Sequence, residues 1–247
     1  RKMKTYGRAE FLKMCEDTIE KFTQSMRNTA KRVGLSMDFA NEYLTDSPEY
    51  RMVTQSIFTQ LFKQGSIIED LRPNIYDPVE GTTIADAEVE RLQRKTKLVD
   101  VKWYTENDEE VIISTTRPEL ICACGVVVVH PDDERYSHLV GQKINLPYDV
   151  VGRDSFVEIS THPSVKSDFG SGVLMVCSFG DQNDVTVFRE LGLTPFQAID
   201  LDGCMTKIAG EYSGLKVKDA RDAVIEHLDS VGKIHQIIEK EQEVPVS

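Results

Sequence analysis

The sequence predicts an α/β protein: a mixed β-sheet that is curved or barrel-like, with surrounding helices, preceded by a helical connector. Two observations support this prediction. In the first third of the chain, apolar residues recur at every third or fourth position, which is the period of one face of a helix. Further along, short β-branched runs alternate with helical stretches, a mixture typical of a domain built from a sheet and helices.

The N-terminal part is predicted to be a helical connector that ends in a ribbon. The spacing of apolar residues predicts one helix over 8–33 and a second helix that Pro48 opens and Gly65 closes. The segment 67–91 mixes short apolar runs with prolines and a glycine, which favours an irregular ribbon over a packed element. We therefore assign the connector and ribbon to residues 1–95.

The remaining residues are predicted to form the α/β domain. β-branched or alternating runs predict strands at 99–105, 111–115, 126–130 and 173–177. Helical spacing predicts helices at 132–140, 181–191 and 218–231. We assign this domain to residues 96–235 and a return linker to residues 236–247.

Composition restricts the class of protein. The 247 residues are 40% hydrophobic and 28% charged, which is ordinary for a soluble globular protein. No apolar run approaches a membrane span and no signal peptide is visible, so we expect a cytoplasmic protein without membrane contact. The five cysteines are scattered without a C-x-x-C pair, and no histidine spacing suggests a metal, so no metal site is expected.

The net charge bears on nucleic-acid binding. A formal charge of −12 argues against an ordinary nucleic-acid binder, because contacts with phosphates dominate such affinity. An acidic chain can still act on RNA through a local basic face, or on an RNA end that another domain delivers.

A first candidate site lies where the strand predicted at 111–115 ends. The segment places three hydroxyls, a guanidinium and a carboxylate around a proline that stops the strand: Ser114, Thr115, Thr116, Arg117 and Glu119. The alternative is a strand end whose hydroxyls cap a following helical turn.

A second candidate site lies in the glycine-rich segment 169–184. Gly172 precedes a buried strand, and Asp181 falls at a helix start, where a carboxylate is favoured. Asp184 follows three residues later, on nearly the same helical face. Two carboxylates at such a turn could hold a cation or orient water. The alternative is an N-cap at Asp181 with a solvated Asp184.

These motifs resemble a known family. Residues 115–119, followed by 129–136, resemble the editing insertion shared by the valyl, isoleucyl and leucyl members of the class I aminoacyl-tRNA synthetases. Gly-Ser-Gly at 170–172, the two aspartates and Leu-Asp-Gly at 201–203 follow in the family's order. Residues 35–65 look like the connector that leads into the insertion, so the resemblance covers nearly the whole chain.

Four departures from the family pattern matter. The W-C-P-x-C position reads Ile-Tyr-Asp-Pro-Val at 75–79, which lacks the metal knuckle. The P-A-H-D position reads Ser-Phe-Gly-Asp at 178–181, a variant similar to archaeal-type valyl enzymes. Met175 stands where many valyl editing sites have a lysine, which argues against a lysine-assisted mechanism. Neither H-I-G-H nor K-M-S-K-S is present, so ATP and Mg²⁺ are expected in the parent synthetase and no cofactor in this chain.

The resemblance implies a function. A valyl-type domain would hydrolyse the ester of threonyl-tRNA(Val), while its parent enzyme ligates valine to tRNA(Val) with ATP. The implied catalytic residues are Asp184, which would hold the substrate's α-ammonium, and Asp181, which would contact the terminal adenosine or the threonyl hydroxyl. The implied substrate-binding residues are Thr115, Thr116, Arg117, Glu119, Gly172 and Met175. The expected partners are the aminoacyl 3′ end of tRNA and the remaining domains of the parent synthetase.

Two alternatives stay open at this point. An isoleucyl-type editing domain shares the scaffold but removes valine from tRNA(Ile). The net charge instead favours a non-catalytic module that binds tRNA or protein. No general base can be assigned from the sequence.

Overall fold

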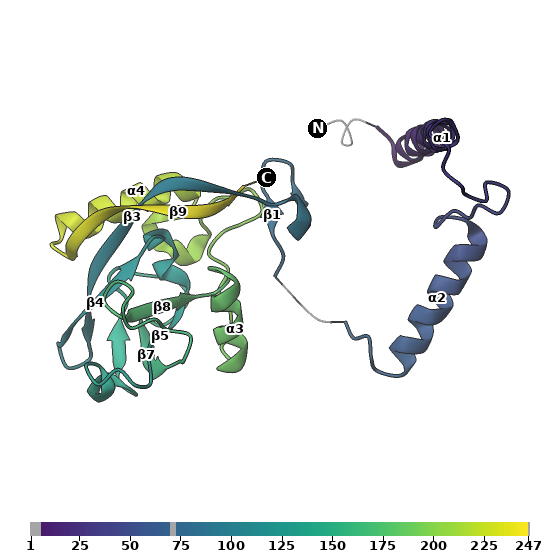
Figure 1. Cartoon of the computed structure of the whole chain (residues 1–247). Helices are drawn as coiled ribbons and strands as arrows, with labels where there is room; N and C mark the ends of the chain where they lie inside the picture. Colours follow the sequence, from purple (N-terminus) through teal and green to yellow (C-terminus); the bar gives the residue numbers. More distant parts are fainter. Residues whose placement is uncertain (1–5, 70–72, 247) are drawn as a thin grey trace. The chain divides into compact units, whose positions relative to one another are not determined.

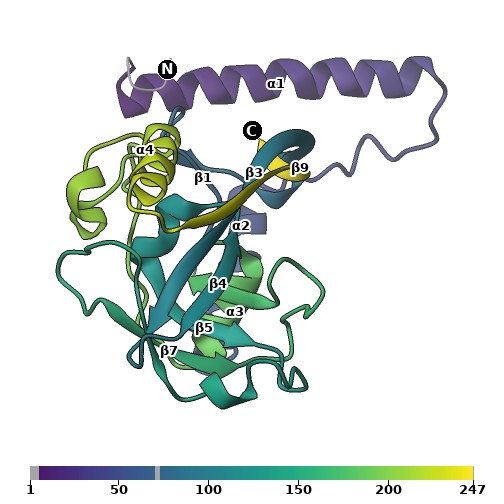
Figure 2. The same cartoon turned by 90° about the vertical axis from the view of Figure 1, so that its left-hand side faces the viewer.

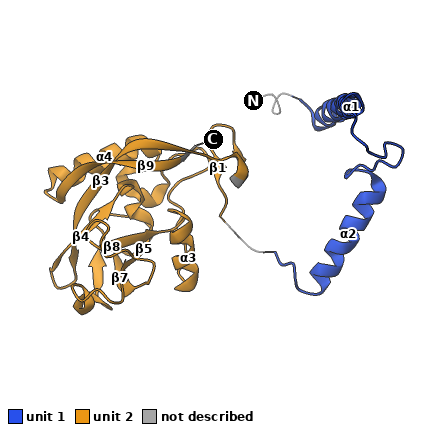
Figure 3. Ribbon diagram, viewed as in Figure 1, with its two compact units in different colours: residues 1–72 blue, residues 73–247 orange. Residues whose placement is uncertain are grey.

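The computed structural model describes residues 6–69 and 73–246. The chain divides into two compact units, unit 1 over residues 1–72 and unit 2 over residues 73–247 (Figure 3). The division falls between residues 72 and 73 rather than near 95. Residues 73–89 belong to unit 2, where Pro78 lies 3.2 Å from the position that a Cβ of Gly203 would take.

Unit 1 consists of two helices, α1 (Arg8–Arg32) and α2 (Pro48–Lys63), as the apolar spacing predicts. Helix α2 starts with Pro48 at its first turn, and the Ser47 hydroxyl accepts a hydrogen bond from the Tyr50 N–H, which caps the helix. No residue of either helix is buried, and apolar side chains such as Phe22 and Met26 are exposed. Unit 1 therefore has amphipathic helices without a core of its own among residues 6–69.

Unit 2 opens with a small hairpin, β1 (Tyr76–Asp77) and β2 (Thr82–Thr83), followed by the 3₁₀ turn η2 (Asp86–Glu88). Residues 73–89 of the irregular ribbon predicted at 67–91 form this hairpin and turn.

A seven-stranded sheet forms the centre of unit 2. Its strands are β3 (Glu90–Thr105), β4 (Glu110–Thr115), β5 (Cys124–Val129), β6 (Lys143–Asn145), β7 (Phe156–Thr161), β8 (Val173–Cys177) and β9 (Ile234–Val246). The order is β4-β3-β6-β7-β5-β8, with β9 also paired to β3. Only the β5–β7 pair is parallel in this sheet. The sheet is mixed and curled (Figures 1 and 2), which confirms the predicted fold class.

The curl brings the two ends of the sheet together. The backbone N–H of Ser171, just before β8, donates to the Ser114 hydroxyl of β4 at 3.1 Å. The first and last strands of the order therefore face each other, and both predicted site segments lie at this junction.

Two helices flank the sheet, α3 (Gln182–Glu190) and α4 (Val217–Ser230), as predicted at 181–191 and 218–231. Three further 3₁₀ turns are η3 (Pro118–Ala123), η4 (Ser137–Leu139) and η5 (Lys207–Tyr212). Strand β5 is a valine run buried on both faces. At Gly125 of β5, an added Cβ would overlap the ring of Phe188, so this glycine lets α3 pack directly on the strand.

Two further expectations from the sequence differ from the structure. The helix predicted at 132–140 is wrong: only η4 is helical there. The backbone N–H of Asp132 donates to His130 Nδ1 and that of Arg135 donates to Asp133 Oδ1, so side chains take up the hydrogen bonds that a helix needs. Residues 236–246, expected as a return linker, belong to β9 and pair with β3.

Candidate active site

The end of β4 and the turn between β8 and α3 meet in one place. Thr115 is buried, and its hydroxyl accepts a hydrogen bond from the Arg117 N–H at 3.0 Å, which turns the chain after the strand. Arg117 then reaches across and donates from Nη1 to the carbonyl of Gly180 at 3.0 Å. Thr116 is half-buried between these residues. The structure thus brings together the two segments that the sequence predicts separately.

Glu119 is buried beside Arg117 and does not line an open surface. The side chain is fully buried, and Arg117 Nε donates to Oε1 at 3.2 Å. Arg221 of α4 donates to both carboxylate oxygens, at 2.9 and 2.7 Å. Because two guanidinium groups already occupy this carboxylate, its role is to hold Arg117 in place rather than to contact a ligand. The Glu119 carboxylate also raises the pKa of Arg221.

Asp181 caps α3. Its Oδ1 accepts a hydrogen bond from the Asp184 N–H at 2.9 Å, and the side chain is exposed. The N-cap interpretation of this residue is therefore confirmed. Asp181 is thus a helix cap whose side chain is exposed.

Asp184 is not the solvated side chain of the alternative interpretation. It is half-buried, and its Oδ2 accepts a hydrogen bond from the Cys177 N–H at 3.2 Å. The pKa of Asp184 is raised to about 7: burial is the largest cause and the charge of Asp181 adds to it, while the Cys177 N–H and the Arg117 charge oppose the shift. Arg117 donates its side-chain hydrogen bonds to Glu119 and Gly180 and not to Asp184. A cationic ligand would stabilise the ionised form of this carboxylate.

Gly180 makes room for this carboxylate. A Cβ at position 180 would overlap Asp184 Oδ2, so a larger residue would displace the acid. The preceding Ser178 is buried, and its hydroxyl accepts a hydrogen bond from the Phe196 N–H at 2.7 Å. Its backbone N–H donates to the carbonyl of Ala123. The turn that carries the two aspartates is therefore fixed from both sides.

The two remaining site residues predicted from the sequence, Met175 and Gly172, have structural roles. Met175 is 6% exposed and packs in the larger hydrophobic core of unit 2. Gly172 has a φ of +82°, and a Cβ there would lie 2.6 Å from Arg135 Nη2 and 2.9 Å from the Ser167 carbonyl. Gly172 thus serves a tight turn before β8.

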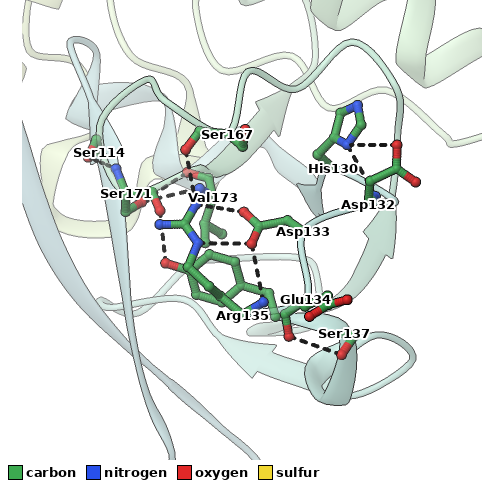
Figure 4. Close-up of polar contacts among 11 residues, drawn as sticks. Ser114, His130, Asp132, Asp133, Glu134, Arg135, Ser137, Ser167, Ser171 and Val173 are labelled. Atoms are coloured by element: carbon green, nitrogen blue, oxygen red, sulfur yellow. Dashed lines mark hydrogen bonds and ion pairs between the residues drawn. The ribbon is translucent and has the colours of Figure 1, made fainter.

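Arg135 holds this turn. Figure 4 shows its guanidinium next to Asp133 and the Ser167 carbonyl. The two bonds to Asp133, at 2.8 and 2.6 Å, lower the pKa of that carboxyl. The neighbouring Tyr136 hydroxyl donates to the carbonyl of Ser171 at 2.8 Å. This cluster fixes the segment before β8 against the turn that follows β5.

Other candidate chemistry is structural. His162 is buried, with its ring nitrogens 2.7 Å from the Ser164 hydroxyl and 2.8 Å from a Glu190 carboxylate oxygen. Within residues 6–69 and 73–246, no three His, Cys, Asp or Glu side chains are grouped to hold a metal ion. In the same residues, no helix is both long and apolar enough to cross a membrane.

Comparison with known proteins assigns the class. A family model described as tRNA synthetases class I (I, L, M and V) matches residues 1–143, so the chain belongs to the class I tRNA synthetases. Among its relatives, the valine–tRNA ligase of Archaeoglobus fulgidus is 40% identical over 240 residues, covering 96% of this chain and 26% of that protein. The valine–tRNA ligase of Nanoarchaeum equitans is 41% identical over 240 residues, covering 97% and 31%.

The chain thus spans between a quarter and a third of the length of these curated relatives. A solved structure, the ternary complex of Agrobacterium radiobacter K84 LeuRS with tRNA and LeuAMS, has a TM-score of 0.44 and 19% identity, covering 91% of this chain and 36% of that chain. The family resemblance stated from the motifs is confirmed by the family model and the valine–tRNA ligases.

Proposed function

We propose that unit 2 is the editing domain of a valine–tRNA ligase and hydrolyses the ester of threonyl-tRNA(Val). The relatives' names support the synthetase, and the motifs at 115–119 and 170–184 support the editing role. The observation that carries the proposal is Asp184: a half-buried carboxylate with a pKa raised to about 7, beside the contact between Arg117 and Gly180 that joins the two candidate segments.

The reaction suits this arrangement. The ionised carboxylate of Asp184 would pair with the α-ammonium of the threonyl group, which places the ester beside Arg117 and the exposed carboxylate of Asp181. Water adds to the ester carbonyl, the C–O bond to the ribose breaks, and threonine and free tRNA leave. An aminoacyl ester is already activated, so positioning and charge stabilisation supply much of the acceleration.

Substrate selection follows from the polar character of the site. Threonine and valine have the same shape, and an apolar pocket rejects an added hydroxyl poorly. A site with polar groups that pair with the hydroxyl discriminates against valine, because valine leaves those groups unpaired. Thr116, half-buried just after β4, and Asp181, exposed at the start of α3, are our candidates for contacting the hydroxyl.

The test is a single-turnover deacylation assay of the whole chain with threonyl-tRNA(Val), valyl-tRNA(Val) and valyl-tRNA(Ile). We expect hydrolysis of the first and at least tenfold slower hydrolysis of the other two. Asp184→Ala should abolish the reaction, whereas Asp229→Ala, which removes an exposed carboxylate of α4, should leave it unchanged.

Three results would contradict the proposal. Faster hydrolysis of valyl-tRNA(Ile) would assign the isoleucyl-type specificity. An unchanged rate in Asp184→Ala would remove this residue from the mechanism. No hydrolysis at high substrate concentration by a folded chain would favour a binding module. In this proposal ATP and Mg²⁺ act in the parent synthetase, and the aminoacyl end of tRNA and the parent's other domains are the partners.

A further inference from the structure

Phe179 has a backbone conformation that bulky residues avoid. Its φ is +58°, in the left-handed region that favours glycine and asparagine. Its side chain is 49% exposed, so burial of the ring does not compensate for the conformation. Among the described non-glycine residues, only Asp108 shares a positive φ, and aspartate tolerates this region better. A strained residue beside a candidate site is a reason to look for a function.

The residues on both sides prevent the turn from relaxing. Before Phe179, the Ser178 N–H donates to the Ala123 carbonyl at 3.0 Å and the Ser178 hydroxyl accepts from Phe196. After it, the Gly180 N–H donates to the Cys177 carbonyl at 3.2 Å. The Gly180 carbonyl also accepts from Arg117. The exposed ring is therefore presented by a rigid turn.

The place of Phe179 in this turn, with its exposed ring, suits contact with a flat aromatic ligand. Phe179 follows the buried Ser178 and precedes Gly180, whose carbonyl accepts from Arg117. The helix cap Asp181 comes two positions after Phe179. The ligand of the proposed function has a cationic amino group, a ribose and an adenine base at one terminus. Aromatic side chains bind unpaired bases by stacking, because every base has a flat π-face.

We infer that Phe179 stacks on the adenine of the terminal adenosine of the tRNA, while Asp184 holds the amino group of the same nucleotide's ester. The inference rests on the proposed function and assigns a second contact to it. The family motif P-A-H-D has alanine at this position, so the aromatic contact belongs to the variant found in this chain.

Two stable probes separate the base from the rest of the ligand: the amide analogue of threonyl-adenosine, and the same amide on a ribose without a base. Their dissociation constants are measured by calorimetry on the whole chain. We expect the adenosine analogue to bind at least tenfold more tightly, which corresponds to about 1.4 kcal/mol. Phe179→Ala should remove this difference and leave binding of the base-free probe unchanged.

Further variants distinguish contact from structure. Phe179→Tyr retains the ring and should keep the tighter binding. Phe179→Gly removes the ring and relieves the left-handed backbone, so its melting temperature should be equal or higher while adenosine binding weakens. Phe156→Ala is the matched control: it removes an exposed ring from β7, which β5 separates from β8, and should have no effect on binding.

The outcomes separate this inference from the proposed function. If the unaltered chain hydrolyses threonyl-tRNA(Val) but Phe179→Ala binds both probes as the unaltered chain does, the stacking contact is wrong and the editing function stands. A lower melting temperature for Phe179→Gly would show that the ring has a structural role and would also overturn the inference. If the unaltered chain neither hydrolyses the tRNA nor binds either probe, both proposals fail.

Discussion

The backbone N–H of Cys177 donates a hydrogen bond to Oδ2 of Asp184 at 3.2 Å, joining the last residue of β8 to the first turn of α3. This contact holds the carboxylate in a half-buried position, where its pKa is raised to about 7. The candidate site carboxylate is therefore placed by backbone geometry, and its charged form is unfavourable until a cation binds beside it.

Asp184→Asn should stabilise the protein. A carboxyl whose pKa is raised in the folded state binds its proton more tightly there than in the unfolded chain, so stability falls as pH rises from about 4 to about 7. The amide cannot ionise and escapes this loss, with an expected gain of about 1–3 kcal/mol at pH 8, since one pKa unit corresponds to about 1.4 kcal/mol. Urea unfolding at pH 5 and pH 8 measures it. An equal or negative change at pH 8 compared with pH 5 would contradict the assignment.

Deacylation should depend on pH through the same carboxyl. Only the ionised form of Asp184 pairs with the ammonium of the substrate, so kcat/KM should fall about tenfold per pH unit below about 7. In the complex the ammonium favours the ionised form, so the midpoint for kcat should lie at lower pH. The measurement is a pH series from 5 to 8.5, with Asp184→Asn as the background for uncatalysed hydrolysis. A flat kcat/KM profile would exclude this role.

Gly180→Ala should reduce activity through Asp184. The new Cβ would overlap Asp184 Oδ2, so the carboxylate must move away from the Cys177 N–H. We expect at least a tenfold fall in kcat/KM, or about 1.4 kcal/mol of transition-state stabilisation. Gly7→Ala is the control, since a Cβ at that position meets no atom within 4 Å. Full activity of Gly180→Ala would show that the position of Asp184 does not matter.

Arg221→Met should destabilise unit 2. It leaves the fully buried Glu119 with Arg117 as its remaining guanidinium partner, and breaking a buried ion pair from one side costs about 3–5 kcal/mol. Arg221 is itself partly exposed, so we expect the lower end of this range. Denaturant unfolding of Arg221→Met, Glu119→Gln and the double variant checks it. The double variant should lose less than the sum of the singles, and simple additivity would contradict a coupled pair.

Local patterns explain which elements could be predicted. The helices α1 and α2 follow the apolar spacing, and β5 and β8 are β-branched runs in a buried sheet. The outer half of β3 and most of β9 are exposed and polar, as in Arg94–Lys97, so no alternation marks them and only their long-range pairing makes them strands.

The candidate site follows the same rule. Turn chemistry and helix starts identify the Thr115–Arg117 segment and the two aspartates separately, because these signals lie within a few residues. Arg117 reaches Gly180 because the curl of the sheet brings β4 beside β8. Arg221 binds Glu119, 102 positions away, because α4 packs on η3. Arg135 and Ser178 have no local signal that would predict their anchoring roles.

The long ladder between β3 and β9 has a further consequence for protein engineering. Glu90 and Val246 are partners in this antiparallel ladder, so the polypeptide enters and leaves residues 90–246 at neighbouring points about 5 Å apart. A segment with such adjacent ends can be spliced into a surface loop of an unrelated host, or have its ends joined by a short peptide, with little disturbance of either fold.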